Sequence, residues 1–252
     1  MALPFFYKED IDLTTTQVVL DEDTSKHIVQ VLRMKTGEKL QLTNGKGNLF
    51  TAEIKDDNRK KCVVTIINKS EIKNPKPKIT IAISLVKNNT RLEWFLEKAT
   101  EIGVTEIIPL ICERTEKTAF KFDRMKSILV SAMLQSQQAW LPVLHEPVKF
   151  VTLVNQAKQE QKFIAHCEDE NNKVSLTSKL ILSEAEGLNP STYPERSRRA
   201  KLILIGPEGD FTTTEIEVAL KNNFTPVALG ETRLRTETAG IVAATLLCIS
   251  TT

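Results

Sequence analysis

The last quarter of the chain holds two similar segments, each typical of a buried strand that runs into a tight polar loop and then opens a helix. The first extends from Leu202 to Phe211 and the second from Leu229 to Ala239. In open α/β sheets, ligands bind at the carboxyl edge where such loops gather. Unpaired N–H groups at the two helix starts face the same edge. The pair of segments therefore predicts an α/β fold with a ligand site at its loops.

Strands and helices alternate through the C-terminal part of the chain. The expected strands are 79–85, 106–110, 162–166, 201–205 and 227–229. The expected helices are 90–102, which begins with capping-box spacing at Thr90, 123–139, one capped by Thr212 and Glu215, and 236–250. Alternation of this kind predicts a largely parallel sheet.

The N-terminal part shows short alternating runs, such as 39–43 and 49–54, separated by turn residues. One helix is expected around 24–34, and the pattern predicts a small β-barrel-like domain. Pro75 and Pro77 then break both periodicities, because prolines lack an N–H donor and bias their predecessors to extended backbone. We expect two domains, 1–72 and 73–252.

Composition sets limits on partners. The chain has 34 basic and 32 acidic residues, a net charge of +2, so RNA contacts must come from local patches. Four scattered cysteines and the lack of a signal-peptide pattern favour a reduced, cytoplasmic protein. The apolar runs are too short to cross a membrane. None of the three histidines has metal-ligand spacing to a cysteine, so we expect no metal. The segment 183–199 has no periodicity and is expected to be an exposed insertion without chemistry.

The loop glycines favour close approach of a ligand to the backbone. Gly206, Gly209 and Gly230 permit that approach, and Pro207 stiffens the first loop. Taken alone, Gly-Pro-Glu-Gly is more typical of a simple turn after a strand; its pairing with the second loop favours a binding site. The chain contains neither G-x-G-x-x-G after a strand nor a P-loop, which disfavours a dinucleotide fold or an NTPase.

Three motifs resemble a known family. They are Gly206-Pro-Glu-Gly-Asp-Phe211, Leu229-Gly-x-Thr-x-Leu-Arg-Thr-Glu-Thr-Ala239, and His27-x-x-x-Val-Leu-Arg33. Together, and more faintly with 92–109, they are similar to the small-subunit (16S) ribosomal RNA (uridine-N3) methyltransferases of the knotted SPOUT superfamily. The resemblance implies an α/β fold: a SPOUT-type parallel-sheet methyltransferase domain with a C-terminal trefoil knot, and a small N-terminal β-barrel (PUA-like) domain.

The chain departs from the family pattern at two places. The family usually has a second glycine where Asp210 stands, and a basic residue near Gln138. The first departure concerns the rim of the cofactor loop, and the second concerns one RNA contact.

The resemblance also implies the cofactor and the partners. The cofactor is S-adenosylmethionine, held by the two loops and their flanks. The implied cofactor-binding residues are Leu204, Ile205, Gly206, Pro207, Glu208, Gly209, Leu229, Gly230, Leu234, Arg235, Thr236, Thr238 and Ala239. The implied partners are small-subunit rRNA, free or in the assembled small subunit, and a second copy of the chain. A homodimer is also favoured by the final helix, whose apolar residues spread over more than one face.

Methylation of a uracil at N3 requires loss of the imide proton, which spreads negative charge onto the flanking carbonyl oxygens. We expect Arg235 to stabilise that charge, because its planar donors suit such oxygens. Glu208 or Glu237 would orient the base or help to take the proton. Two alternatives stay open: Glu237 only complements the helix dipole, and Thr236 is only an N-cap.

Four basic residues are candidate RNA contacts. Arg33 and Lys35 are expected to contact phosphates, while His27 has either a structural or an RNA-binding role. Arg91 and Arg114 lie near the predicted sheet edge, with a solvated charge as the alternative for each. Two other functions also fit the sequence: a transfer RNA methyltransferase of related fold, and a non-catalytic RNA-binding protein.

Overall fold

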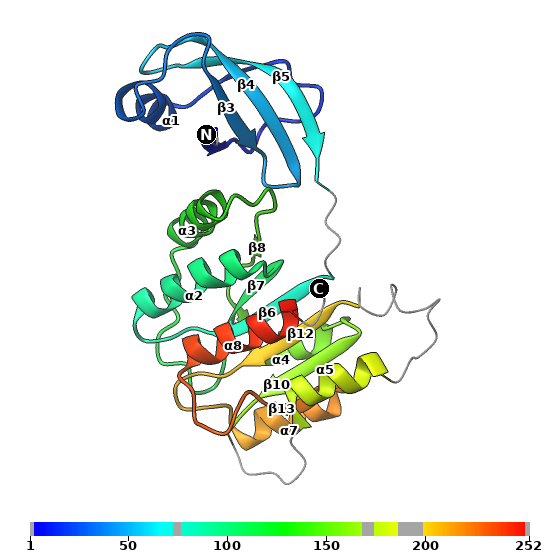
Figure 1. The fold of residues 1–252 in the computed structure, drawn as a ribbon. Coiled ribbons are helices and arrows are strands. Elements are labelled where there is room, and N and C mark those ends of the chain that lie inside the picture. The colour runs from blue at the N-terminus through cyan, green and yellow to red at the C-terminus, as the bar shows by residue number, and fades with distance from the viewer. Residues whose placement is uncertain (1–2, 73–76, 168–173, 186–198, 250–252) are drawn as a thin grey trace. The chain divides into compact units, whose positions relative to one another are not determined.

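The computed structural model describes residues 3–72, 77–167, 174–185 and 199–249. The chain divides into two compact units (Figure 1). The N-terminal unit comprises 1–74 together with 133–141, and the C-terminal unit comprises 75–132 and 142–252. Each unit has its own sheet and its own core.

The N-terminal unit is built on a curved five-stranded sheet with strand order β1-β3-β4-β5-β2. The strands are β1 (Phe5–Tyr7), β2 (Gln17–Val19), β3 (Lys39–Thr43), β4 (Asn48–Asp56) and β5 (Val63–Glu71). All pairings are antiparallel except that of β1 with β3. Alternate residues of β4, namely Phe50, Ala52 and Ile54, are buried in the core, as the period of two requires.

The helix expected at 24–34 is shorter and lies earlier. It consists of α1 (Glu22–Lys26) and a π-helical turn, η1 (His27–Val31). The Asp21 side chain caps α1 by accepting a hydrogen bond from the Thr24 N–H at 2.9 Å. Arg33 has a φ of 56°, which leaves the helical region, so the expected extension to Met34 was wrong.

The segment 133–141 packs within the N-terminal unit although it is distant in sequence. The Leu141 N–H donates to the Gly45 carbonyl at 2.8 Å, and Trp140 Nε1 donates to the Ile72 carbonyl at 3.1 Å. Helix α3 (Phe122–Gln135) ends within this segment, because Gln137 has a φ of 55°; the expected end at 139 was therefore too late.

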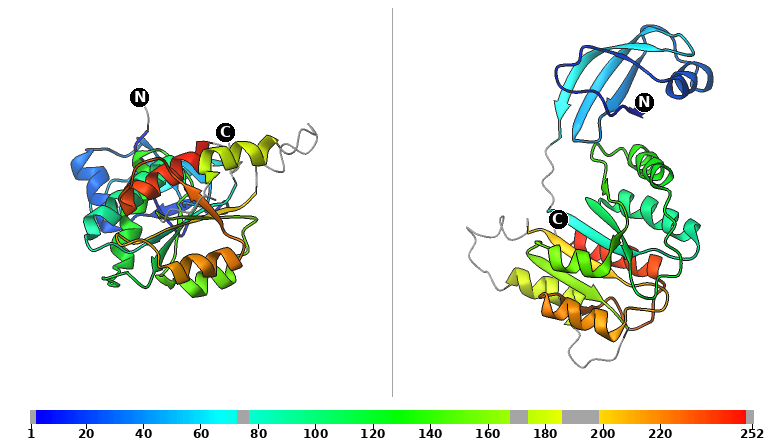
Figure 2. Two further views of the ribbon diagram at one scale, coloured as in Figure 1. Left: turned by 90° about the horizontal axis from the view of Figure 1, so that it is seen from below. Right: turned by 180° about the vertical axis from the view of Figure 1, so that it is seen from behind.

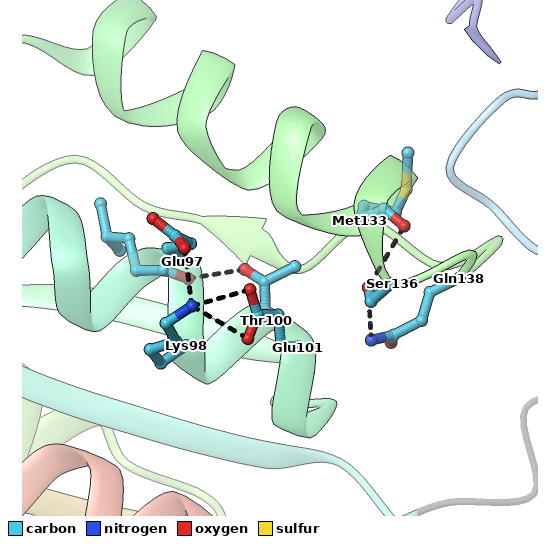
Figure 3. Close-up of polar contacts among 8 residues, drawn as sticks. Glu97, Lys98, Thr100, Glu101, Met133, Ser136 and Gln138 are labelled. Carbon is cyan, nitrogen blue, oxygen red and sulfur yellow. Dashed lines mark hydrogen bonds and ion pairs between the residues drawn. The ribbon is translucent and has the colours of Figure 1, made fainter. Parts of the chain in front are cut away.

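The segment that follows α3 is held by polar contacts. Ser136 Oγ donates to the Met133 carbonyl at 3.3 Å, and Gln138 Nε2 donates to Ser136 Oγ at 3.0 Å (Figure 3). Gln138, which stands near the family's basic position, thus stabilises this turn.

The C-terminal unit contains an eight-stranded sheet in which every recorded pairing is parallel, as expected. Its order is β11-β13-β10-β12-β6-β7-β8, with β9 beside β7. The strands are β6 (Ile79–Ser84), β7 (Glu106–Ile111), β8 (Val143–Leu144), β9 (Val148–Lys149), β10 (Gln161–Ala165), β11 (Val174–Ser175), β12 (Lys201–Ile205) and β13 (Thr225–Ala228). Every residue of β6 and β12 is buried, which agrees with their largely apolar sequences.

Helices cover both faces of this sheet (Figure 2). They are α2 (Asn89–Ile102), α5 (Leu176–Ala185) and α8 (Thr236–Ile249) on one face, with α4 (Phe150–Gln156) and α7 (Thr213–Lys221) on the other. On the second face, Phe150 and Ile216 pack in one cluster with Leu202 and Leu204.

Two of the three helix-end signals predicted from the sequence of this unit are confirmed. The capping box of Thr212 and Glu215 forms as expected, and Gly103 ends α2 with a φ of 100°. The cap of α2 is Asn88 instead of the expected Thr90, because the Asn88 side chain accepts from the Thr90 N–H. Helix α5 includes the start of the expected insertion; its remainder, 186–198, lies outside the described residues.

Candidate functional site

The two C-terminal loops meet at the carboxyl edge of the sheet. The first loop, 206–212, follows β12, and the second loop, 229–235, follows β13; β10 lies between these two strands. The Thr236 hydroxyl donates to the Gly206 carbonyl at 3.0 Å, and both residues are buried. Thr236 therefore connects the start of α8 to the first loop, in addition to any capping role.

Most of the predicted cofactor residues line two adjoining cavities. The first, of about 270 Å³, is called the inter-loop cavity. The predicted residues in its wall are Ile205, Gly206, Pro207, Glu208, Leu234, Arg235, Thr236 and Ala239. The second, the β13 cavity, has about 420 Å³ and adds Leu229 and Gly230. Ala165 and Cys167, from the end of β10, belong to both walls. Cavities of this size suit a small organic ligand.

Three predicted cofactor residues line neither cavity. Leu204 is fully buried in β12, and Thr238 is half-buried on α8. Gly209 lines a third cavity of about 380 Å³, the β7 cavity, together with Arg114 and Glu208. The first loop therefore presents residues to cavities on two sides.

Arg91 joins the two candidate carboxylates. Its Nη1 lies 3.4 Å from Glu208 Oε1, and its Nε lies 3.6 Å from Glu237 Oε1. Glu237 is buried in the first turn of α8, where a carboxylate also complements the helix dipole. Its Oε2 has no hydrogen-bond partner among the described residues. Arg91 is thus an ion-pairing group of the site that remains partly exposed, and its contact with RNA stays a prediction.

Arg114 holds the backbone of the first loop. Its Nη1 donates to the Gly209 carbonyl at 2.7 Å and lies 3.5 Å from the Phe211 carbonyl. The turn that carries Arg114 is itself held by Glu215, whose Oε1 accepts a hydrogen bond from the Glu113 N–H at 2.9 Å. The capping box identified Glu215, but nothing local in the sequence pointed to its bond with Glu113.

Cys112 begins that turn, and its thiol is unreactive. Burial, with a further contribution from the charge of Glu215, raises the pKa of the Cys112 thiol to about 12. The thiol therefore stays protonated at neutral pH and is a poor nucleophile.

The remaining candidate residues differ in whether their side chains form ion pairs or other contacts. The Arg235 side chain is exposed and has no hydrogen bond or ion pair within the described part of the chain. In the N-terminal unit, Arg33 is exposed, and Lys35 Nζ lies 3.6 Å from Asp57 Oδ2. His27 is exposed and packs edge-on against Phe6, with ring centroids 5.9 Å apart.

The described ranges contain neither a metal-ligating cluster nor a membrane-spanning helix. No group of three metal-ligating side chains occurs among these residues. None of the helices they form has the length and apolarity to cross a bilayer.

Comparison with known proteins identifies the family. Residues 73–248 match the model of an RNA methyltransferase domain, and residues 20–67 match that of an RNA methyltransferase PUA domain. The ribosomal RNA small subunit methyltransferase E of Buchnera aphidicola subsp. Acyrthosiphon pisum is 30% identical, over 97% of this chain and 92% of that protein.

Two solved structures extend the match to the fold. A probable rRNA-methyltransferase from Porphyromonas gingivalis is 37% identical with a TM-score of 0.81, covering 96% of this chain and 95% of that one. The ribosomal RNA small subunit methyltransferase E of Neisseria gonorrhoeae, solved with S-adenosyl methionine bound, is 27% identical with a TM-score of 0.78 and the same coverage. The chain therefore belongs to an RNA methyltransferase family that includes ribosomal RNA small subunit methyltransferase E proteins.

Proposed function

We propose that this protein uses S-adenosylmethionine to methylate N3 of a uridine in small-subunit (16S) ribosomal RNA. The observation that carries the proposal is the convergence of the two loops on one cavity, with Arg235 in its wall and Glu208 beside Arg91. The family to which the chain belongs supports the substrate class.

The cavity walls suit S-adenosylmethionine. Ile205, Leu234 and Ala239 provide apolar surface for an adenine ring, and the backbone at Gly206 can meet its polar edge. Glu208 adds a carboxylate to the same wall, which suits a ligand that carries a sulfonium and an ammonium group. When bound, the cofactor supplies an electrophilic methyl group.

The protein's part in the reaction is to manage the proton and the charge of the uracil. Arg235 would stabilise the anion that spreads over the carbonyl oxygens as N3 loses its proton, since its guanidinium has no partner among the described residues. Glu208 is the better placed of the two glutamates to receive the proton, because it is exposed and lines the cavity, whereas Glu237 is buried. Arg91 holds Glu208 beside the cavity.

The N-terminal unit would dock RNA. Arg33 stands at a left-handed position directly after two exposed apolar residues, Val31 and Leu32, so its charge projects from a fixed turn. Arg33 and Lys35 would contact phosphates, with affinity that falls as salt rises. A trefoil knot at the loops, a homodimer, and action in the cytoplasm on rRNA or assembled subunits complete the proposal.

The test uses RNA from a strain that lacks the gene. Small subunits, their free rRNA and transfer RNA from that strain are incubated with the protein and S-adenosylmethionine, and modified nucleosides are mapped by mass spectrometry. We expect 3-methyluridine at one site of the rRNA and none in transfer RNA. Methylation of transfer RNA alone, or at another base atom, would refute the proposal.

A further inference from the structure

Asp210 has a backbone conformation that few side chains adopt. Its φ is 66°, in the left-handed region, where glycine is favoured and asparagine and aspartate are the best-tolerated alternatives. Its N–H donates to the Pro207 carbonyl at 2.9 Å, which closes the turn of the first loop. The turn explains why a small residue stands here, but a glycine would satisfy it equally well.

The carboxylate of Asp210 does something that a glycine cannot. Oδ1 accepts a hydrogen bond from the Phe211 N–H at 2.8 Å, and Oδ2 accepts one from the Cys167 N–H at 2.7 Å. Cys167 lies two residues after β10, the strand next to β12, so the second bond joins the first loop to the segment that leaves the neighbouring strand. Bonds from N–H groups to a charged acceptor are about twice as strong as neutral ones.

This bond lies in the wall of the inter-loop cavity, because both Asp210 and Cys167 line it. Arg114 holds the same loop on its other side through the Gly209 carbonyl. The buried ring of Phe211 fixes the end of the loop in the core independently of either bond. Loss of the Asp210 carboxylate would therefore loosen one wall of the cavity and leave the fold intact.

We propose that Asp210 is a cofactor-positioning residue of this chain: its carboxylate fastens the first loop to Cys167 and so presets the cavity for S-adenosylmethionine. The inference rests on the proposed cofactor. A loop that is already in its bound conformation loses less entropy on binding, so the bond raises affinity without touching the ligand.

The test compares Asp210→Gly with Asp210→Asn in the full chain. Both replacements accept a positive φ, whereas alanine would add backbone strain. Glycine removes both side-chain bonds, and asparagine keeps one acceptor oxygen. The matched control is Asn223→Gly, which changes an exposed residue at a φ of 62° that follows α7 and lies outside both loops and the three cavities.

Calorimetry would measure the affinity for S-adenosylmethionine and for S-adenosylhomocysteine, its uncharged-sulfur product. For Asp210→Gly we expect both dissociation constants to rise together by roughly tenfold, with a smaller rise for Asp210→Asn and none for Asn223→Gly. The KM for cofactor should rise while kcat at saturating cofactor and the melting temperature stay unchanged. Hydrogen exchange should be faster at the Cys167 and Phe211 amides of Asp210→Gly.

Two results would overturn the inference. An unchanged affinity in Asp210→Gly would mean that the bond does not preset the cavity. A loss confined to S-adenosylmethionine would mean that the carboxylate acts directly on the sulfonium charge instead. If the wild-type protein itself fails to bind either compound, it is the proposed function that fails.

Discussion

The three predicted arginines of the site, Arg91, Arg114 and Arg235, differ in whether their side chains already have a partner. Arg91 is committed to Glu208 and Glu237, and Arg114 to the carbonyls of the first loop. Of these three, Arg235 is the one whose side chain has no partner in the described structure. Its guanidinium, like that of Arg233 in the same cavity wall, is therefore able to respond to charge developing on a substrate.

Arg235→Ala should slow single-turnover methylation by roughly 100-fold or more, the size typical of losing one preorganised donor. The reason is that charge on the uracil oxygens develops only as the proton leaves, so the loss falls on kcat. Arg235→Lys should recover only part of the rate, because an ammonium lacks the planar fork. Arg199→Ala, which removes a surface arginine paired with Glu160, is the matched control. Weaker RNA binding with an unchanged single-turnover rate would make Arg235 a docking residue.

Glu106 is a buried carboxylate away from the loops, at the start of β7. It accepts hydrogen bonds from the Thr80 hydroxyl at 2.6 Å and from Lys78 Nζ at 3.1 Å, and its Oε1 lies 2.6 Å from His145 Nε2. Burial by itself would raise the pKa of Glu106, but these bonds and the charge of Lys78 outweigh it and hold the pKa below 4.5, its ordinary value.

The lowered pKa of Glu106 determines the direction in which protein stability changes with pH. Because the folded pKa is lower than the unfolded one, the stabilisation is present above the ordinary value and is lost as the pH falls through the folded pKa. Glu106→Gln should lower the free energy of unfolding by about 1.5–3 kcal/mol at pH 7. Denaturant unfolding at pH 7 and at lower pH should show the gap between the two proteins narrowing in acid. A gap that is independent of pH would exclude this role.

At this scale the sequence predicted which residues line the site better than how they are held. Gly206, Gly230 and Arg235 could be chosen because their chemistry is local to each loop. The Asp210 bond to Cys167 and the Arg91 pair with Glu237 could not, because each joins positions distant in sequence whose proximity depends on the strand order.

At the scale of elements, the cavity depends on how closely α8 packs on β6 and α2. Gly240 is the contact point: a Cβ there would lie 2.6 Å from Phe95 Cε2 and 2.9 Å from Ile83 Cδ1. The same helix begins with Thr236, which bonds to Gly206, so its position is transmitted to the first loop.

On the surface of α2, Lys98 Nζ lies 2.7 Å from Glu97 Oε1 and 3.1 Å from Glu101 Oε1 (Figure 3). Such exposed pairs contribute little to stability compared with the buried helix contact.

Gly240→Ala should destabilise the protein although alanine is the better helix former. Overpacking a tight core site costs about 1–3 kcal/mol, against a gain of about 1 kcal/mol in helix propensity. Phe95→Leu should relieve the overlap, so denaturant unfolding of the double variant should show a loss smaller than the sum of the two single losses. Additive losses would mean that Phe95 is not the obstacle.

Element types could be predicted from periodicity, whereas several ends could not. The helix expected at 24–34 changes to π geometry at His27 and ends by Val31, and α3 ends at Gln135. In both cases a non-glycine residue with positive φ, Arg33 or Gln137, follows the end. Neither residue type is an end signal in sequence, because arginine and glutamine rarely adopt a positive φ.

At the scale of the whole molecule, the N-terminal unit is not continuous in sequence. The segment 133–141 packs in it, and a Cβ at Gly47 would overlap the Trp140 ring. A Cβ at Gly45 would lie 2.9 Å from Leu141 Cβ. Pro75 and Pro77 marked a domain boundary, but the return of a later segment has no local sequence signal.

Deletion of residues 1–72 should leave S-adenosylmethionine binding intact and abolish RNA methylation. The cavity residues all belong to the C-terminal unit, whereas Arg33 and Lys35 are removed. The deletion also exposes Trp140 and Leu141, so the melting temperature should fall and Trp140→Ser in the truncated protein should reduce aggregation. Calorimetry and the rRNA assay would test this, and full methylation by the truncated protein would contradict the division of roles.

The last prediction is that the protein is a homodimer that packs through α8. In the isolated chain, Ile241, Val242 and Leu246 are only half-buried on this helix, and Ile249 is 67% exposed. Apolar side chains that remain accessible along one helix favour a self-complementary contact, because a twofold axis buries the same patch on both copies.

Sedimentation at micromolar concentration should therefore give twice the mass of the 28.3 kDa chain. Ile249→Glu should shift the equilibrium toward monomer. A twofold contact would bury this glutamate on both copies without a partner and would bring the two like charges together. Val19→Glu, at a 55% exposed valine of the N-terminal unit, is the matched control and should not change the mass. Since α8 also carries Thr236 and Ala239 of the inter-loop cavity, dissociation should weaken cofactor binding in Ile249→Glu. A monomeric wild-type protein that binds the cofactor would show that each site is complete within one chain.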